Sequence, residues 1–142
     1  MIQEVANRLN TLRKYVDILR GYQSKSLEDI EKDFTLKGAI ERYLQVAIEC
    51  ALDIGEIIIA AEGFRKPETY REVIEILGKE GVLPQDFAIR FAPAAGFRNI
   101  LVHAYSDIDV RKLYEFLQER LEDFDTFAMY ISRYLEKKIS QE

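Results

Sequence analysis

The chain has 142 residues, of which 48% are hydrophobic and 32% charged, and this length fits a single domain, expected over residues 1–142, with one core. Its formal net charge of −5 gives it no general affinity for nucleic acid, so any contact with RNA would need a local basic surface. Seven Gly and three Pro are too few for a protein of many short strands and tight turns.

The first half of the chain predicts two long helices joined by a short helical turn. Apolar residues recur at alternating steps of three and four from Ile2 to Leu19 and again along Ile40–Ala61, which places each set on one helix face. Between them, Ser26 and Asp29 have the spacing of a capping box that could open a short helical turn. Gly63 is expected to end the second long helix.

The second half predicts a short helix, a helix interrupted by proline and a third long helix. Thr69 can cap a helix from Tyr70 to about Lys79. Pro84 suits the first residue of the next helix, which Pro93 should kink or restart. The spacing of apolar residues from Val110 to Leu135 predicts one long final helix. Together these elements predict an all-α fold, an antiparallel up-and-down four-helix bundle with an additional short helix.

Cysteine content and hydropathy bear on where the protein acts. Cys50 is the only cysteine, so no disulfide can form within the chain. The first residues lack a basic region followed by a long apolar run, and the run Ile57–Ala61 is far too short to span a bilayer. We therefore expect a cytoplasmic protein without a membrane partner.

The sequence contains few groups suited to catalysis. It has no Gly-rich phosphate loop and no cluster of Cys and His, and its single histidine cannot supply the paired Glu-x-x-His repeats of a di-iron bundle. We therefore expect neither a metal nor another cofactor. Cys50 lies in an apolar helix and is interpreted as a buried structural thiol.

The remaining candidate is the segment around the histidine. On a regular helix, four apolar residues share the side expected to face the core: Phe97, Ile100, Leu101 and Ala104. Arg98 and Tyr105 lie on one edge of this stripe, and Asn99 and His103 lie on the other. Arg98 and His103 are roughly 140° apart on one helix. A two-fold dimer could bring edges from two copies into one cleft.

This segment could act on RNA, although the residue types leave a simpler interpretation open. A histidine can move the proton of a 2′-hydroxyl near neutral pH, and an arginine can hold the phosphate. Attack by the 2′-oxygen needs no metal and would leave a 2′,3′-cyclic phosphate. On residue types alone, Arg98 and His103 are more often a surface pair near a helix end, where the histidine interacts with the helix dipole.

Three segments carry a resemblance to a known family. They are Glu41-Arg42-Tyr43-Leu44-Gln45-Val46-Ala47-Ile48-Glu49, Pro67-Glu68-Thr69-Tyr70-Arg71-Glu72 and Gly96-Phe97-Arg98-Asn99-Ile100-Leu101-Val102-His103-Ala104-Tyr105. Over nearly its whole length the chain resembles the HEPN superfamily, and within it the minimal HepT-like (DUF86) proteins. The last segment is similar to the family's R-x4-H-x-Y motif.

The resemblance implies a HEPN-like bundle that forms a homodimer, with the two motifs meeting at a cleft. It implies a metal-independent endoribonuclease toxin paired with an MNT-type nucleotidyltransferase antitoxin, with RNA as the substrate. Arg98 and His103 would be the catalytic pair, and Asn99 a supporting polar residue. Tyr105 would be the residue to which the antitoxin transfers AMP.

A second function remains open beside the ribonuclease. The chain could be a non-catalytic HEPN binding or scaffold partner of a nucleotidyltransferase, and its acidic net charge favours this alternative. The presence of Arg98, His103 and Tyr105 together favours the ribonuclease, because a scaffold would not need all three.

Five aromatic residues recur at helical spacing in the final helix. We interpret them as contacts of the core and of the dimer rather than as a platform for stacking bases. They are Phe116, Phe124, Phe127, Tyr130 and Tyr134.

Overall fold

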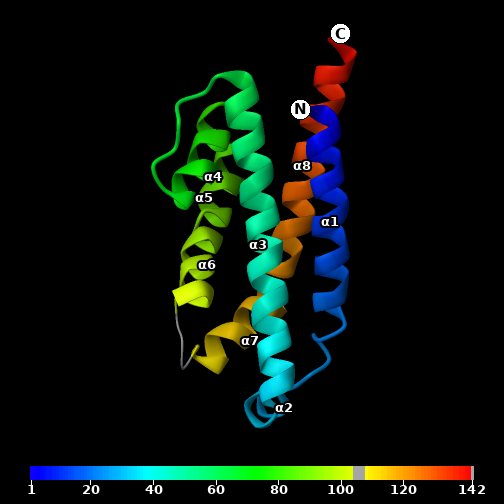
Figure 1. Ribbon diagram of the computed structural model, residues 1–142, viewed down its shortest axis with the longest axis vertical. Coiled ribbons are helices and arrows are strands. Elements are labelled where there is room, and N and C mark those ends of the chain that lie inside the picture. The colour runs from blue at the N-terminus through cyan, green and yellow to red at the C-terminus, as the bar shows by residue number, and fades with distance from the viewer. Residues whose placement is uncertain (104–107, 142) are drawn as a thin grey trace.

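The computed structural model describes residues 1–103 and 108–141, and within these ranges the regular structure is entirely helical (Figure 1). The helices are α1 (Ile2–Arg20), α2 (Leu27–Lys32), α3 (Phe34–Glu62), α4 (Tyr70–Lys79), α5 (Gln85–Phe91), α6 (Pro93–His103), α7 (Val110–Glu119) and α8 (Leu121–Ser140). The prediction of an all-α bundle is confirmed.

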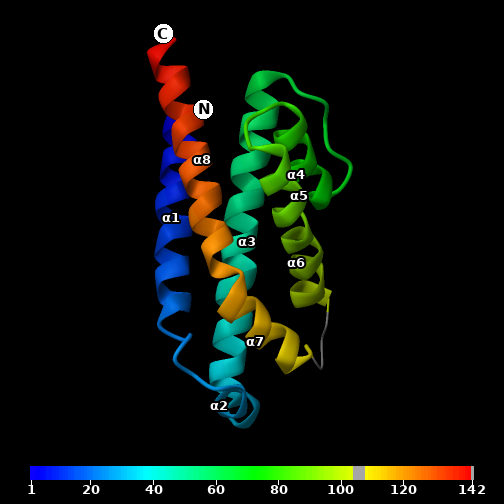
Figure 2. The same cartoon turned by 180° about the vertical axis from the view of Figure 1, so that it is seen from behind.

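The long helices run up and down along one axis. Helix α1 runs from the end marked N to the opposite end, α3 returns, α5 and α6 run down again, and α8 returns to the end where both termini lie (Figures 1 and 2). These four columns are the predicted antiparallel bundle. The short elements exceed the one expected: α2 and α7 lie at the end of the bundle away from the termini, and α4 packs beside α3.

Local sequence signals explain where several helices begin and end. Ser26 and Asp29 form the predicted capping box at the start of α2, each side chain accepting a hydrogen bond from the other's backbone N–H. The Thr69 hydroxyl accepts a hydrogen bond from the backbone N–H of Glu72 and caps α4. Gly63 ends α3 with a φ of 71°, a left-handed conformation that glycine adopts at little cost.

Gly55 allows α4 to lie close against α3. A Cβ atom built on Gly55 would be 2.5 Å from Cγ1 of Val73 and 3.2 Å from Cδ1 of Leu77, both of which are fully buried residues of α4. The absence of a side chain at this position therefore sets the distance between the two helices.

The prediction of one final helix from Val110 to Leu135 is wrong, because the helix is interrupted at Arg120: α7 ends at Glu119 and α8 begins at Leu121. Asp123, in the first turn of α8, is 8% exposed and forms ion pairs with Arg90 of α5 at 3.0 Å and with Arg120 at 3.4 Å. A carboxylate at this place stabilises a new helix N-terminus. The apolar spacing continues across the break, which is why the spacing alone did not reveal it.

Pro93 begins a separate helix, α6, so of the two predicted outcomes, a kink or a restart, the restart is confirmed. Pro84 precedes α5 as its N-cap instead of being its first residue, a shift of one position from the prediction. None of the helices in residues 1–103 and 108–141 combines the length and the apolar character needed to cross a membrane.

Candidate active site

Helix α6 carries three of the four residues predicted for the site. It packs against α3 and α4 through small or apolar side chains, of which Ala94, Ala95 and Leu101 are buried. The Phe97 ring stacks on Phe116 of α7, with 4.6 Å between ring centroids. The site residues are therefore placed by a helix that reaches three neighbouring elements.

The predicted core face of this helix is partly wrong. Leu101 is buried and Phe97 packs against the core, but Ile100 is 43% exposed, and Ala104 lies outside the described residues. The buried stripe runs through Ala94 and Leu101, and Arg98 lies between them on the same helix face. Because Arg98 occupies this inner face, Ile100 is turned outward.

The Arg98 guanidinium is held by partners from two other helices. Its Nε and Nη2 donate hydrogen bonds to Oε2 of Glu49 in α3, at 3.2 Å and 3.0 Å, and its Nη1 donates one to Oδ1 of Asn99 at 3.3 Å. Its carbon Cζ lies 4.6 Å from the centroid of the Tyr70 ring in α4, within the range of a cation–π contact. The Arg98 side chain is only 16% exposed, so these partners fix its position.

These hydrogen bonds leave part of the guanidinium available. An arginine has five N–H donors, and the bonds to Glu49 and Asn99 use three of them. One N–H remains on Nη1 and one on Nη2. Glu49 thus holds the side edge of Arg98, and the donors that remain suit an additional oxyanion such as a phosphate.

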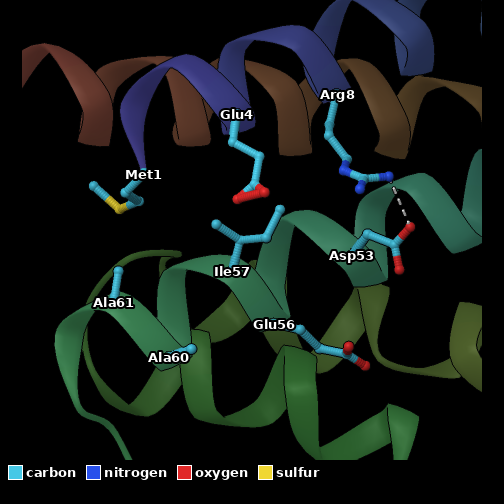
Figure 3. A pocket seen from close by; sticks show the side chains of 8 residues that line it. All are labelled: Met1, Glu4, Arg8, Asp53, Glu56, Ile57, Ala60 and Ala61. Carbon is cyan, nitrogen blue, oxygen red and sulfur yellow. Dashed lines mark hydrogen bonds and ion pairs between the residues drawn. The ribbon is translucent and has the colours of Figure 1, made fainter.

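Arg98 opens onto a hollow of about 270 Å³ lined by Glu49, Leu52, Asp53, Tyr70 and Arg98 itself. Asp53 also lines an adjoining hollow between α1 and α3, where its carboxylate pairs with Arg8 at 3.3 Å (Figure 3). Asp53 therefore borders both hollows.

Two carboxyl groups that border these hollows have pKa values above their ordinary range. Burial is the main cause that raises the pKa of Asp53, with a further contribution from Glu49, while Arg8 opposes the rise. Burial, followed by the charge of Asp53, raises the pKa of Glu56. The local field around Arg98 is therefore less positive than the arginine alone would produce.

The structure brings Arg98 and Asn99 together but does not join them to His103. His103 is the last residue of α6 and is exposed, and no hydrogen bond links it to Arg98 in the described part of the chain. This divergence agrees with the angle expected on a regular helix. Tyr105, the predicted AMP acceptor, lies outside the described residues.

Sequence reasoning missed the roles of Glu49 and Tyr70. Both stood in segments of the family resemblance, yet neither was assigned a contact with Arg98. Glu49 did carry a signal, because it is the single charge in the otherwise apolar run Val46–Leu52. A carboxylate in such a run needs a partner when the helix is packed. Nothing in the spacing indicated Tyr70, because its contact depends on how α4 folds back.

The described residues offer neither a metal site nor an accessible thiol nucleophile. No group of three or more His, Cys, Asp or Glu side chains in residues 1–103 and 108–141 is arranged to hold a metal ion. Cys50 is 7% exposed, as predicted for a structural thiol, and burial raises the pKa of its thiol.

Comparison with known proteins places the chain in a family. The model of the ribonuclease HepT-like family matches residues 12–131, so the protein belongs to this family. It is 31% identical over 131 residues to the tRNA nuclease HepT of Aphanizomenon flos-aquae, which covers 92% of this chain and 89% of that protein. It is 24% identical over 123 residues to the mRNA nuclease HepT of Shewanella oneidensis, covering 87% and 92% of the two chains.

The fold is also shared with a solved structure. A tri-AMPylated HEPN toxin of Shewanella oneidensis, in complex with an MNT antitoxin, matches with a TM-score of 0.82 and 23% sequence identity. The match covers 91% of this chain and 96% of that chain. The helices described above are thus those of a HEPN fold.

Proposed function

We propose that this protein is a metal-independent endoribonuclease and the toxin of a HepT/MNT-type toxin–antitoxin pair. The observation that carries the proposal is Arg98, held by Glu49, Asn99 and Tyr70 at the wall of a hollow with two donors left for a phosphate. Membership in the ribonuclease HepT-like family and the nuclease names of two relatives support it.

In the proposed reaction each site residue has one role. Arg98 binds the scissile phosphate and stabilises the charge that grows on its oxygens. His103 removes the proton of the 2′-hydroxyl, whose oxygen attacks phosphorus while the bond to the 5′-oxygen of the next nucleotide breaks. The leaving 5′-oxygen takes a proton from water, so the products are a 2′,3′-cyclic phosphate and a 5′-hydroxyl. Asn99 supports Arg98 through its side-chain oxygen.

The proposed site is shared between two copies of the chain. Arg98 faces inward toward α3 whereas His103 is exposed at the end of α6. A homodimer in which the two α6 helices approach each other would let His103 of one copy work with Arg98 of the other. Ile100, exposed between them, would then be covered by the second copy.

The proposed partner is an MNT-type nucleotidyltransferase that silences the enzyme. The HEPN toxin of Shewanella oneidensis was solved with an MNT antitoxin in a tri-AMPylated state. On this precedent, the antitoxin would transfer AMP from ATP to the hydroxyl of Tyr105 and release pyrophosphate. The added negative phosphate would compete with RNA for the arginine of the motif.

Cleavage of labelled RNA in buffer containing EDTA tests the proposal. Wild type should cut and leave a cyclic phosphate, whereas Arg98→Ala and His103→Ala should each lower the rate by about 10²- to 10⁴-fold with unchanged helical content. Arg71→Ala, at an exposed position of α4, is the matched control and should cut like wild type. RNA carrying 2′-O-methyl groups should resist cleavage.

The same experiment can reject the proposal. Activity that depends on added metal would contradict the mechanism, and normal cutting by His103→Ala would contradict the site. A wild-type protein that cuts no RNA yet binds its nucleotidyltransferase would support the alternative of a non-catalytic partner.

A further inference from the structure

A second groove lies on α8, away from Arg98. It has a volume of about 410 Å³ and is lined on one side by the turn between α4 and α5 and on the other by Tyr130, Arg133, Tyr134 and Lys137 of α8. Figure 2 shows α8 and this turn on the near side of the molecule. Helix α4 separates the two sites: Tyr70 in its first turn borders the Arg98 hollow, and Gly78 in its last turn borders this groove.

The charge of this groove differs from that of the whole protein. Arg133 and Lys137 are both exposed, and neither forms an ion pair in residues 1–103 and 108–141. The lining contains these two cations and no carboxylate, although the chain as a whole carries a net charge of −5. A concentration of unpaired cations in an acidic protein is the footprint of an anionic ligand.

Two tyrosine rings lie beside the two cations. Tyr130 and Tyr134 are one helical turn apart on α8, and so are Arg133 and Lys137. The two tyrosines therefore form an aromatic column along the helix, and the two cations form a second column beside it. The Arg133 guanidinium carbon lies 5.9 Å from the centroid of the Tyr130 ring. The rings are half-buried, so each keeps an accessible part in the groove.

The walls of the groove are held in place by packing. The Tyr130 ring contacts Phe87 of α5 with 5.5 Å between centroids. A Cβ atom on Gly78 would lie 2.5 Å from Cβ of Ala88, so the last turn of α4 packs tightly against α5. Lys138 lies 5.6 Å from the centroid of the Tyr134 ring and pairs with Glu62 at 2.6 Å. The aromatic column is therefore a fixed surface rather than a set of free side chains.

We propose that this groove binds single-stranded RNA, with Arg133 and Lys137 on its phosphates and the rings of Tyr130 and Tyr134 against its bases. Cations that follow a backbone beside aromatic rings that stack bases are the usual elements of single-strand recognition. Phe124 and Phe127 are core residues, as expected, and Tyr130 and Tyr134 pack against the core and also line the groove. Only for these two tyrosines is a stacking role proposed here. The proposal rests on RNA being the substrate and places a second contact with it outside the cleavage site.

The test separates binding from cleavage. The probe is a fluorescein-labelled 20-nucleotide single-stranded RNA of mixed sequence with 2′-O-methyl groups, which the proposed reaction cannot cut. Arg133→Glu/Lys137→Glu should bind it about tenfold more weakly, with a shallower dependence of the logarithm of affinity on the logarithm of salt concentration. Tyr134→Leu should weaken binding with little change in salt dependence, because stacking is lost but charge is not.

The control carries the same change in charge elsewhere. Lys14→Glu/Lys25→Glu reverses two exposed cations, on α1 and in the turn after it, and should leave binding within about twofold of wild type. With cuttable RNA, the groove variant should show a raised KM and a wild-type kcat, because Arg98 and His103 are intact.

Each result decides one of the two proposals. Equal losses in the groove and control variants, or no loss in either, would overturn the groove proposal even if RNA is cleaved. Loss of nucleotidyltransferase binding with unchanged RNA binding would also overturn it and would mark the groove as a protein contact. If wild type cuts no RNA but the groove variant alone loses RNA binding, the groove proposal stands and the proposed nuclease function fails.

Discussion

Arg98 is a partly buried charge whose position depends on Glu49. A guanidinium at 16% exposure is costly to dehydrate unless its N–H groups are satisfied, and Glu49 accepts two of them through one oxygen. Glu49 is itself steadied by Gln45, whose side-chain amide donates a hydrogen bond to Oε1 at 3.3 Å. We interpret Glu49 as a positioning residue, since in the proposed reaction it would act on RNA only through Arg98.

Glu49→Gln should slow the proposed cleavage without abolishing it. The amide cannot hold the guanidinium as a carboxylate does, so Arg98 would sample positions away from the phosphate, and kcat should fall by about ten- to a hundredfold with little change in KM. Single-turnover and steady-state kinetics measure this split.

Glu56→Gln provides the control for this prediction. Glu56 lies two turns further along α3, and in residues 1–103 and 108–141 it forms no hydrogen bond or ion pair with Arg98. Its variant should keep the wild-type kcat. A wild-type kcat in Glu49→Gln as well would show that Glu49 has no part in placing Arg98.

Asp53→Asn should stabilise the protein at neutral pH. Burial raises the pKa of Asp53 above its ordinary value, so the folded state binds the proton of this carboxyl more tightly than the unfolded state does. Its contribution to the free energy of unfolding is therefore fully present below the unfolded pKa of about 3.9 and is lost as pH rises through the folded pKa. The gain from the amide should therefore be largest near pH 7 and shrink toward about pH 4, as read from urea unfolding.

Glu72→Gln should behave in the opposite way. The backbone N–H of Glu68 and the side chain of Arg65 lower the pKa of Glu72, so its stabilisation exists above the unfolded pKa and is lost as pH falls through the folded one. The variant should be less stable at pH 7, with a difference that vanishes in acid.

A gain for Asp53→Asn that does not change with pH would contradict the assignment of its pKa.

At the scale of single residues, the sequence predicted the site only where the residue type carried the signal. Arg98 and His103 could be named because they match the R-x4-H-x-Y motif of the family that the chain resembles. Their partners could not, since Glu49 and Tyr70 are 49 and 28 positions away from Arg98 in the chain and meet it only after three helices pack. Ile100 was misplaced because periodicity cannot tell which face a helix shared by several neighbours will bury.

At the scale of elements, the contact between α3 and α4 depends on a single missing side chain. Gly55→Ala should destabilise the protein by about 1–3 kcal/mol, because the new Cβ would meet the stiff, fully buried Val73 at 2.5 Å. Since Tyr70 belongs to α4, the same change should disturb its contact with Arg98. Chemical denaturation measures the loss.

Gly38→Ala, on the same helix, is the matched control. Nothing lies within 4 Å of a Cβ atom at Gly38, so alanine should raise stability by about 0.5–1 kcal/mol through its helix propensity. Effects of the same sign in both variants would contradict the role given to Gly55.

Helix starts and stops were predictable where short-range chemistry sets them. The Ser26 capping box, the Thr69 cap and the glycine that ends α3 are encoded within four residues and were read correctly. The break at Arg120 was not, because it depends on Arg90, 33 positions before Asp123, reaching that buried carboxylate.

At the scale of the whole molecule, the proposed homodimer gives the exposed Ile100 a function. Ile100→Glu should convert the dimer into a monomer, because a carboxylate buried against a second α6 without a partner is costly. Light scattering at micromolar concentration measures the change, and cleavage should fall with it because the proposed site needs both copies.

Ile89→Glu is the control for the dimer. Ile89 is 66% exposed on α5, and its replacement should leave the assembly unchanged. A wild-type monomer, or an Ile100→Glu variant that remains dimeric, would contradict a dimer built on α6.

The anchoring of α6 has a consequence for how the protein opens. This helix is isolated from α5 by Pro93, and its buried side chains are two alanines and one leucine, whereas α3 buries eleven residues along its length. Burial of so little apolar surface gives α6 a low free energy of local unfolding, so its amides should exchange with solvent deuterium well before those of α3. Two contacts then hold α6 in its packed position. They are the ion pair of Arg98 with Glu49 and the stacking of Phe97 on Phe116. Binding of a phosphate or of a second chain should therefore slow amide hydrogen exchange in α6 before it slows exchange in the other helices.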